Sequence, residues 1–454
     1  MARTQALAPA DQGYQRDLGD GLRVRWSTAD DTERIAYMSS HVFRRTSDDP
    51  PNEHNVRWIH DLMSGRHPLM GPVDYALVED TQSGAIVAAT NLLAQVWEYG
   101  GIAFGVGRPE LVATDERYRN RGLIRAIFEL IHARSAARGH LVQGITGIEY
   151  FYRQFGYEYA LELDTGRTVA FTDIPSLKAD TTEPFRLRPA TLEDVPLLQR
   201  LYAREQHSAP VTTLPSGDYW RWILDGMDAR SGEGWDTQVL DDADGRATGY
   251  VLRARLRWHP NVNVWGLAVL PEVSLVEALP SLLRALRDQA PTMPTRKPDL
   301  PPATNLGLIL GSSHPVYDAL GAVPSRAIAP PYAWYIRVPE LPRFMRHIAP
   351  VLERRLADSV AARYNGDLKL NFYRGGLRLL FEAGRLTLAE DWRRSTWETA
   401  SAGFPPGIFL QLLFGHRGLD ELRHIFPDVS VEGDVAPVLR ALFPAQRSFV
   451  RPLD

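Results

Sequence analysis

The chain of 454 residues has no cysteine, which excludes a disulfide framework, a zinc–thiolate site and a cysteine nucleophile. It has no apolar run of the roughly 18–20 residues that a membrane-spanning helix needs, so we expect no membrane partner. It also lacks an excess of charge of one sign, because 51 basic side chains stand against 55 acidic ones. This balance argues against a nucleic-acid partner.

Missing motifs narrow the function further. The twelve histidines show no metal-binding spacing such as HExxH, so the sequence offers no metal ligand. There is no P-loop, and Gly105-Val-Gly107 is not followed by the third glycine of a dinucleotide-binding loop. The N-terminal stretch MARTQALAPADQGYQRD lacks the apolar core of a signal peptide, which predicts a cytoplasmic protein with a flexible tail over residues 1–20.

The chain does contain an internal repeat. The stretch FRLRPA at 185–190 echoes LRVRWST at 22–28, and the helical pattern TLEDVPLLQRLYA echoes the pattern at 32–43. Both halves later place a glycine four residues after a tyrosine, as in Tyr152 with Gly156 and Tyr317 with Gly321. We interpret this as two copies of one α+β fold of about 150 residues.

The repeat divides the chain into a first unit at 21–172, a linker at 173–184, a second unit at 185–336 and a third unit at 337–454. Hydrophobic periodicity predicts the elements of the first unit: strands at 22–28, 75–78, 85–96, 104–114 and 141–148, helices at 32–43, 56–63 and 122–138, and a strand pair within 157–171. In the third unit it predicts a helix at 341–357 and a hairpin around Arg374-Gly375-Gly376.

One segment carries phosphate-binding chemistry. In LVATDERYRNRGLIRAIFE (111–129) a strand ends at Thr114, a loop carries three arginines, and Gly122 opens a helix. Backbone N–H groups at a helix N-terminus bind phosphate, and arginine adds bidentate charge-assisted bonds. The pattern favours a pyrophosphate ligand, and the alternative is a basic surface loop. The matching place in the second unit, LAVLPEVSLVEAL (267–279), has neither the arginines nor the glycine, so we expect no such ligand there.

This segment resembles the coenzyme A loop of GNAT acetyltransferases, Arg/Gln-x-x-Gly-x-Gly/Ala. Arg119-Asn-Arg-Gly122-Leu-Ile124 matches the first and fourth positions, and Ile124 replaces the small last residue. The segment EYFYRQFGYEYALEL (149–163) is similar to the closing part of that fold. The whole layout over about 21–454 resembles the enhanced intracellular survival (Eis) type, including its third domain. The run YRQFGY at 152–157 is similar to the YxRFGY run of that family, with Gln154 in place of its arginine.

The resemblance implies tandem GNAT folds, the first active and the second degenerate, plus a C-terminal sterol-carrier-like α+β domain. It implies acetyl-CoA as co-substrate, a small polyamine or aminoglycoside-like primary amine as acceptor, and a homo-oligomer, by resemblance a hexamer. The backbone of Val112, Ala113 and Thr114 would hold the thioester carbonyl and pantetheine. The pyrophosphate would bind Arg119, Asn120, Arg121, Gly122, Leu123 and Ile124.

Two residues are expected to move protons. Tyr152 would protonate the leaving thiolate; the alternative is a packed core aromatic, because Tyr150, Phe151 and Phe155 surround it in sequence. In Eis-type enzymes the terminal carboxylate reaches the first domain's cleft and acts as base, which here points to Asp454; a frayed terminus is the alternative. A protein lysine acetyltransferase and a non-catalytic coenzyme A or lipid binder remain alternative functions.

Overall fold

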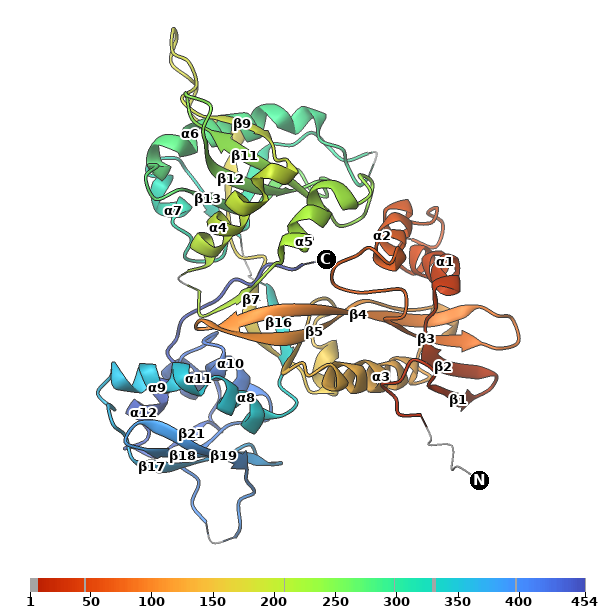
Figure 1. Cartoon of the computed structure of the whole chain (residues 1–454), viewed down its shortest axis with the longest axis vertical. Coiled ribbons are helices and arrows are strands. Elements are labelled where there is room, and N and C mark those ends of the chain that lie inside the picture. The colour runs from red at the N-terminus through yellow and green to blue at the C-terminus, as the bar shows by residue number, and fades with distance from the viewer. Residues whose placement is uncertain are drawn as a thin grey trace.

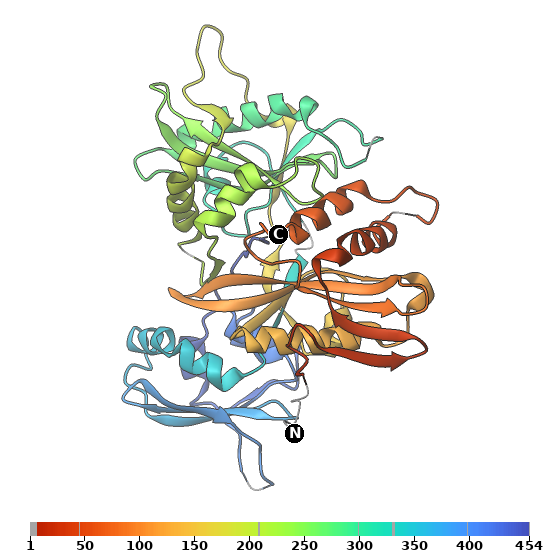
Figure 2. The ribbon, with the colours of Figure 1, turned by 45° about the vertical axis from the view of Figure 1, so that its right-hand side comes forward.

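The structure is a computed structural model that describes residues 7–44, 46–207, 209–297, 299–328, 332–396 and 398–453. These residues form three β-sheets with helices packed against them. In Figures 1 and 2 the first sheet lies in the middle, the second sheet lies above it and the third below it. No helix within the described ranges is long and apolar enough to cross a membrane.

The first sheet has the order β1-β2-β3-β4-β5-β6-β16-β7, and β10 adds to the outer end of β4. Its strands are β1 (Gln15–Gly19), β2 (Leu22–Trp26), β3 (Tyr75–Asp80), β4 (Ile86–Tyr99), β5 (Ile102–Thr114), β6 (Val142–Ile145), β7 (Glu158–Leu163), β10 (Val211–Thr213) and β16 (Tyr332–Arg337). Its helices are α1 (Thr32–Val42), α2 (Glu53–Met63) and α3 (Leu123–Ala137).

Strand periodicity explains why helices cover both faces of this sheet. Successive strand residues point to opposite faces. In β3, Ala76 and Val78 pack with α3, whereas Tyr75 and Leu77 pack with α1 and α2. The strands are therefore apolar on both sides, as the near-continuous buried runs in β3 and β4 also indicate.

The second sheet has the order β15-β8-β14-β13-β12-β11-β9. Its strands are β8 (Arg167–Ala170), β9 (Arg186–Pro189), β11 (Trp235–Asp241), β12 (Ala247–Ala254), β13 (Asn261–Val269), β14 (Asn305–Leu308) and β15 (Arg326–Ala327). Its helices are α4 (Val195–Gln206), α5 (Gly217–Arg221), α6 (Leu275–Gln289) and α7 (Val316–Ala319).

A matched pair of ion bridges supports the internal repeat. Arg25 on β2 holds Asp31 through two bonds of 2.8 and 2.9 Å, and Arg188 on β9 holds Asp194 through two bonds of 2.7 and 2.9 Å. Each aspartate also closes a capping box at the start of the following helix. Burial opposes ionisation of Asp31, but its arginine and backbone bonds outweigh this and lower its pKa to about 2.

The two upper sheets exchange strands near the predicted unit boundaries. β16, which follows most of the second unit in the chain, lies between β6 and β7 of the first sheet. In return β8, which follows β7 after only a short turn, pairs with β14 and β15 of the second sheet. The two units are therefore tied together through backbone hydrogen bonds, while their division at residues 172 and 185 remains a proposal.

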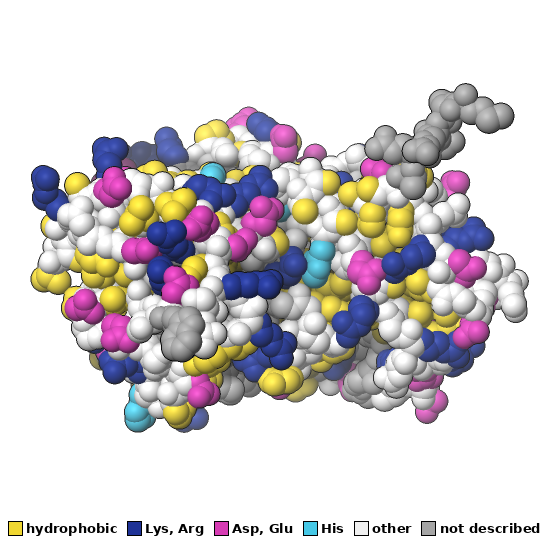
Figure 3. All heavy atoms as spheres, turned by 90° about the horizontal axis from the view of Figure 1, so that it is seen from below, with side chains coloured by type: hydrophobic (Ala, Val, Ile, Leu, Met, Phe, Trp, Pro, Cys, Tyr) yellow, Lys and Arg dark blue, Asp and Glu magenta, His cyan; other side chains and the backbone are white. Residues whose placement is uncertain are grey.

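The third sheet has the order β19-β18-β17-β20-β21. Its strands are β17 (Gly366–Asn371), β18 (Gly376–Glu382), β19 (Arg385–Asp391), β20 (Ala402–Gly403) and β21 (Ser430–Val431). Its helices are α8 (Leu341–His347), α9 (Ala349–Ala357), α10 (Ile408–Leu413), α11 (Leu419–Ile425) and α12 (Ala436–Leu442). Its apolar core is continuous with that of β4, β5 and β16 in the first sheet. Figure 3 shows the molecule from below, the end at which the third sheet lies. On this face basic and acidic side chains are interspersed.

Most predicted elements are confirmed, including the helix at 122–138 and the hairpin at Arg374-Gly375-Gly376. Two predictions are wrong in part. The helix at 341–357 breaks at Ile348, because Pro350 in the next turn cannot donate an N–H bond and crowds the preceding turn. The tail at 1–20 includes the edge strand β1 at Gln15–Gly19, which pairs with β2.

Candidate active site

The arginine loop joins β5 to the N-terminus of α3. Asn120 and Gly122 both have positive φ, 63° and 74°, and the turn that they make starts the helix at Leu123. The first N–H groups of a helix have no partner within it and carry the positive end of its dipole. Gly122 has open space around its Cα, so its backbone conformation explains the glycine and a ligand can approach closely.

The three loop arginines differ in their partners. Arg117 is bound to Asp115 at 2.7 Å, and Arg121 stacks on the ring of Tyr118 at 5.1 Å. The exposed guanidinium of Arg119 forms no hydrogen bond or ion pair with the described residues, and it lines a hollow of about 760 Å³ beside α1. Among the three, Arg119 is thus the best placed to bind an incoming phosphate.

A β-bulge lies directly before this loop. In the β4–β5 ladder Ala89 pairs with Ala113 and Asn91 with Glu110, so Thr90 alone stands opposite Leu111 and Val112. Leu111 has a φ of 54°, a rare conformation for a branched side chain. Thr90 fixes the bulge because its hydroxyl donates to the Glu110 carbonyl at 2.7 Å.

Strands β5 and β6 separate at this point. They pair in parallel only at Val106 with Val142 and Gly107 with Gln143. Beyond Gly107, no strand within the described ranges pairs with that side of β5. Alternate backbone N–H groups of an antiparallel strand point away from its partner. The stretch at Val112–Thr114 therefore presents backbone donors to the space between the two strands.

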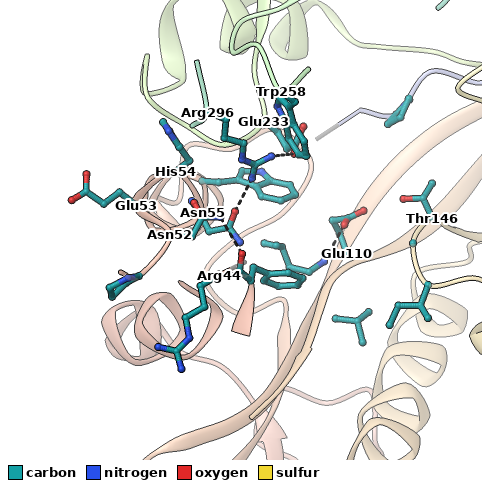
Figure 4. Close-up of a pocket in the computed structure, with 18 of the residues that line it drawn as sticks. Arg44, Asn52, Glu53, His54, Asn55, Glu110, Thr146, Glu233, Trp258 and Arg296 are labelled. Carbon is teal, nitrogen blue, oxygen red and sulfur yellow. Dashed lines mark hydrogen bonds and ion pairs between the residues drawn. The ribbon is translucent and has the colours of Figure 1, made fainter. Parts of the chain in front are cut away.

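A cavity of about 980 Å³ opens at this separation. One wall is β5 at Glu110–Val112, and another is the segment Ile145–Ile148, which begins at the last residue of β6. The connection from α1 to α2 forms the third side, and loops of the second sheet cover the top. Figure 4 shows Arg296 of these loops pointing toward Asn55 on α2, with Glu110 and Thr146 on the far side.

Tyr152 lies in the wall of this cavity. Its side chain is 2% exposed and packs against Phe128 on α3 and Tyr335 on β16, with ring centroids at 6.0 and 5.4 Å. Its hydroxyl lies next to Gly147, where a Cβ would be 3.7 Å from the oxygen. Most of the Tyr152 ring is therefore packed against other aromatic rings, as the packed-aromatic interpretation expects. Because Tyr152 also lines the cavity, it can still reach a ligand bound there.

Four charged groups in the cavity form two pairs. Arg108 is bound to Glu110 at 2.5 Å. Arg296 donates to Asn55 at 3.1 Å, lies 3.7 Å from Glu233 and covers the ring of Trp258. Asp164 differs, because it forms no hydrogen bond or ion pair with the described residues. Burial raises its pKa above the usual aspartate range.

The C-terminal tail runs between the first and second sheets, as both ribbon views show. Trp334 donates to the carbonyl of Val450 at 2.8 Å, and Arg451 is bound to buried Glu205 at 3.0 Å. The carbonyl of Leu453 accepts from Gln95 and Arg108, both at 2.7 Å. Pro452 lines the cavity. Asp454, the predicted base, lies outside the described residues.

The predicted residues thus fall into two neighbouring groups. Val112 and Tyr152 line the cavity, with Ala113 and Thr114 next to Val112 along β5; the residues from Arg119 to Ile124 surround the start of α3. The sequence analysis missed Asp164, Glu110 and Gln95. These residues can be recognised as part of the site only in the folded chain, where separate segments bring them together. No local sequence pattern predicts this.

The second unit offers no equivalent of the arginine loop. The N-terminus of α6 is already capped by Ser274, whose hydroxyl accepts from the N–H of Glu277, and this glutamate adds a negative charge there. Tyr317, the counterpart of Tyr152, is buried and donates to the carbonyl of Leu308 at 3.0 Å. The purely structural role expected for this unit stays a prediction.

Comparison with known proteins adds a family assignment for part of the chain. Residues 23–160 match the acetyltransferase (GNAT) domain model. No curated protein matches the chain. Among solved structures, it is similar to a conserved protein of unknown function and probable N-acyltransferase from Enterococcus faecalis, with a TM-score of 0.66, 16% identity and coverage of 95% of this chain and 100% of that one.

Two further structures have the same fold. A GCN5-related N-acetyltransferase from Anabaena variabilis gives a TM-score of 0.62 at 12% identity, covering 94% of this chain and 99% of that one. Eis1 from Mycobacterium abscessus gives 0.56 at 15% identity, covering 94% and 98%. The chain is an acyltransferase with a GNAT domain, a mixed α/β fold and several sheets, and a domain of this type uses acetyl-CoA.

Proposed function

We propose that the protein is an N-acetyltransferase that moves acetyl from acetyl-CoA directly to a primary amine of a small polyamine or aminoglycoside-like acceptor. The observation that carries the proposal is one cavity bordered by the β5 bulge, Tyr152 and the C-terminal tail, on the strand that leads into the loop before α3. The thioester is already activated, so the reaction needs no covalent enzyme intermediate.

The coenzyme would enter from the start of α3. Arg119 and the N–H groups of Gly122, Leu123 and Ile124 would bind its pyrophosphate, with Asn120 and Arg121 shaping the turn. The pantetheine would then follow β5 past Thr114 and Ala113. Backbone donors near Val112 would hold the thioester carbonyl, where negative charge develops as the amine attacks.

Two proton transfers complete the reaction. The amine nitrogen attacks the carbonyl carbon, the C–S bond breaks, and the hydroxyl of Tyr152 gives its proton to the sulfur. The ammonium proton of the acceptor would pass to the terminal carboxylate of Asp454, directly or through water. The tail supports this assignment because its carbonyl at Leu453 is held by Gln95 and Arg108 on the cavity side of β4 and β5.

The shape of the cavity favours a small acceptor over a protein lysine. Loops of the second sheet with Trp258 and Arg296 cover it, and Pro452 of the tail closes another side. An extended peptide would need an open groove instead. We further propose that the second unit is a degenerate GNAT fold, that the third unit is sterol-carrier-like, and that the protein assembles as a homo-oligomer, by resemblance a hexamer.

The test is release of free thiol from acetyl-CoA in the presence of a panel of small primary amines, with mass spectrometry of the acetylated products. We expect amine-dependent thiol release and one acetyl group added per thiol. Thiol release that is independent of every amine, or acetyl-CoA binding without turnover on any of them, would contradict the proposal.

A further inference from the structure

Asp164 occupies an unusual position in the fold. It lies in the turn where β7 of the first sheet ends and the chain crosses to β8 of the second. Its φ of 57° is left-handed, a conformation that aspartate tolerates better than most residues. The turn has little freedom, because Gly311 donates to the carbonyl of Thr165 at 2.9 Å and a Cβ on Gly166 would lie 2.0 Å from the carbonyl oxygen of Leu308.

No residue in the described part of the chain satisfies the charge of this carboxylate. It lines the same cavity as Tyr152, and burial without a charged partner raises its pKa. Two other acids in the cavity lining have partners, since Glu110 is bound by Arg108 and Glu233 lies beside Arg296. A half-buried carboxylate in this setting gains most from a cation that arrives with a ligand.

The reaction places different demands on the two amines of an acceptor that has more than one. The attacking nitrogen must lose its proton, so it cannot stay paired with a carboxylate as an ammonium ion. A second amine keeps its charge throughout. The cavity of about 980 Å³ is large for a single amine, and Asp164 and Tyr152 both contribute to its lining.

We propose that Asp164 binds a second, non-reacting ammonium group of the acceptor and thereby makes the enzyme selective for di- and polyamines. The inference rests on the proposed N-acetyltransferase function and names the feature of the acceptor that its site recognises. Asp164 is a specificity residue here, whereas the proton transfers belong to other groups.

The experiment compares 1,4-diaminobutane with 4-amino-1-butanol, which has the same length and replaces one ammonium by a neutral hydroxyl. For the unaltered protein we expect kcat/KM to favour the diamine by about tenfold or more, the scale of a hydrogen bond to a charged group. Asp164→Asn should bring this ratio close to one, and Asp164→Glu should keep part of it. Acetyl-CoA affinity should stay the same in all variants.

Asp180→Asn is the matched control. Asp180 also has a left-handed φ, 61°, but is exposed in the linker, so this variant loses the same charge away from the cavity. Its ratio should equal that of the unaltered protein. A ratio near one in the unaltered protein, or an unchanged ratio in Asp164→Asn, would overturn the inference. A damaged fold would lower kcat/KM equally for both acceptors and would weaken acetyl-CoA binding.

Calorimetric binding of the same two amines to the protein–coenzyme A complex separates this inference from the proposed function. If no amine of the panel is acetylated, these two included, the proposed function fails. The inference still predicts tighter binding of the diamine, lost in Asp164→Asn, and equal binding of the two amines would refute it.

Discussion

Glu205 on α4 and Arg451 of the tail form a buried ion pair that ties the C-terminus to the second sheet. Their side chains are 2% and 1% exposed, and their closest atoms are 3.0 Å apart. Leu267 N–H and the hydroxyl of Tyr250 also donate to Glu205, and Arg451 donates to the carbonyl of Trp265. Removing one partner of such a pair leaves a buried charge without compensation, which costs about 3–5 kcal/mol.

The ionisation of Glu205 reflects the same interactions. Burial alone would raise its pKa, but Arg451 first, then His314 and Tyr250, lower it from 4.5 to about 2. Such a shift corresponds to about 3 kcal/mol of stability. Because the folded pKa is the lower one, this contribution is fully present above about pH 4.5 and is lost as the pH falls toward 2.

We therefore expect Glu205→Gln to lower the free energy of unfolding in urea by about 3–5 kcal/mol at pH 7. It should also let carboxypeptidase remove the tail of the native protein and should reduce amine transfer. The double variant Glu205→Gln with Arg451→Met removes both charges and should regain part of the stability. Additive effects of the two substitutions, or a Glu205→Gln variant with unchanged stability at pH 7, would refute the reasoning.

Three further outcomes follow from the same account. Tyr152→Phe keeps the ring packing and removes the proton donor, so stopped-flow or steady-state turnover should fall by about 100-fold to 10,000-fold while acetyl-CoA affinity stays the same; unchanged turnover would return Tyr152 to a purely structural role. Deleting Leu453 and Asp454, or adding a short C-terminal tag, should abolish transfer and leave acetyl-CoA binding intact, and a fully active tagged protein would remove the terminus from the mechanism. Light scattering at micromolar concentration should give a multiple of the 51.0 kDa chain mass, and a monomeric mass would contradict the oligomer.

Local patterns predicted the parts of the molecule that local sequence determines. The apolar stripe of α3, the glycine at its start and the glycine hairpin at 375–376 each act within a few residues, so periodicity and turn chemistry reveal them. The arginine loop was found for the same reason. Its neighbours along the chain are also its neighbours in space.

Long-range pairing was beyond the reach of those patterns. β16 pairs with β6 and β7 although nearly the whole second unit lies between them in the chain, and no pattern within YAWYIR indicates which strands it pairs with. β1 was missed because QRDLG has no apolar alternation; it is an edge strand with its side chains at most half-buried. The role proposed for Asp164 depends on the crossing of β7 into β8, which only the folded chain reveals.

The central claim is that acetyl-CoA binds at the N-terminus of α3 and nowhere in the second unit. Calorimetric titration with acetyl-CoA tests it most directly, on the unaltered protein, on Arg119→Glu and on Arg423→Glu, which reverses an exposed charge on α11 as a control. The account predicts one coenzyme per chain, a sharp loss of affinity in Arg119→Glu and no change in Arg423→Glu. Two coenzymes per chain, or unchanged affinity in Arg119→Glu, would contradict it.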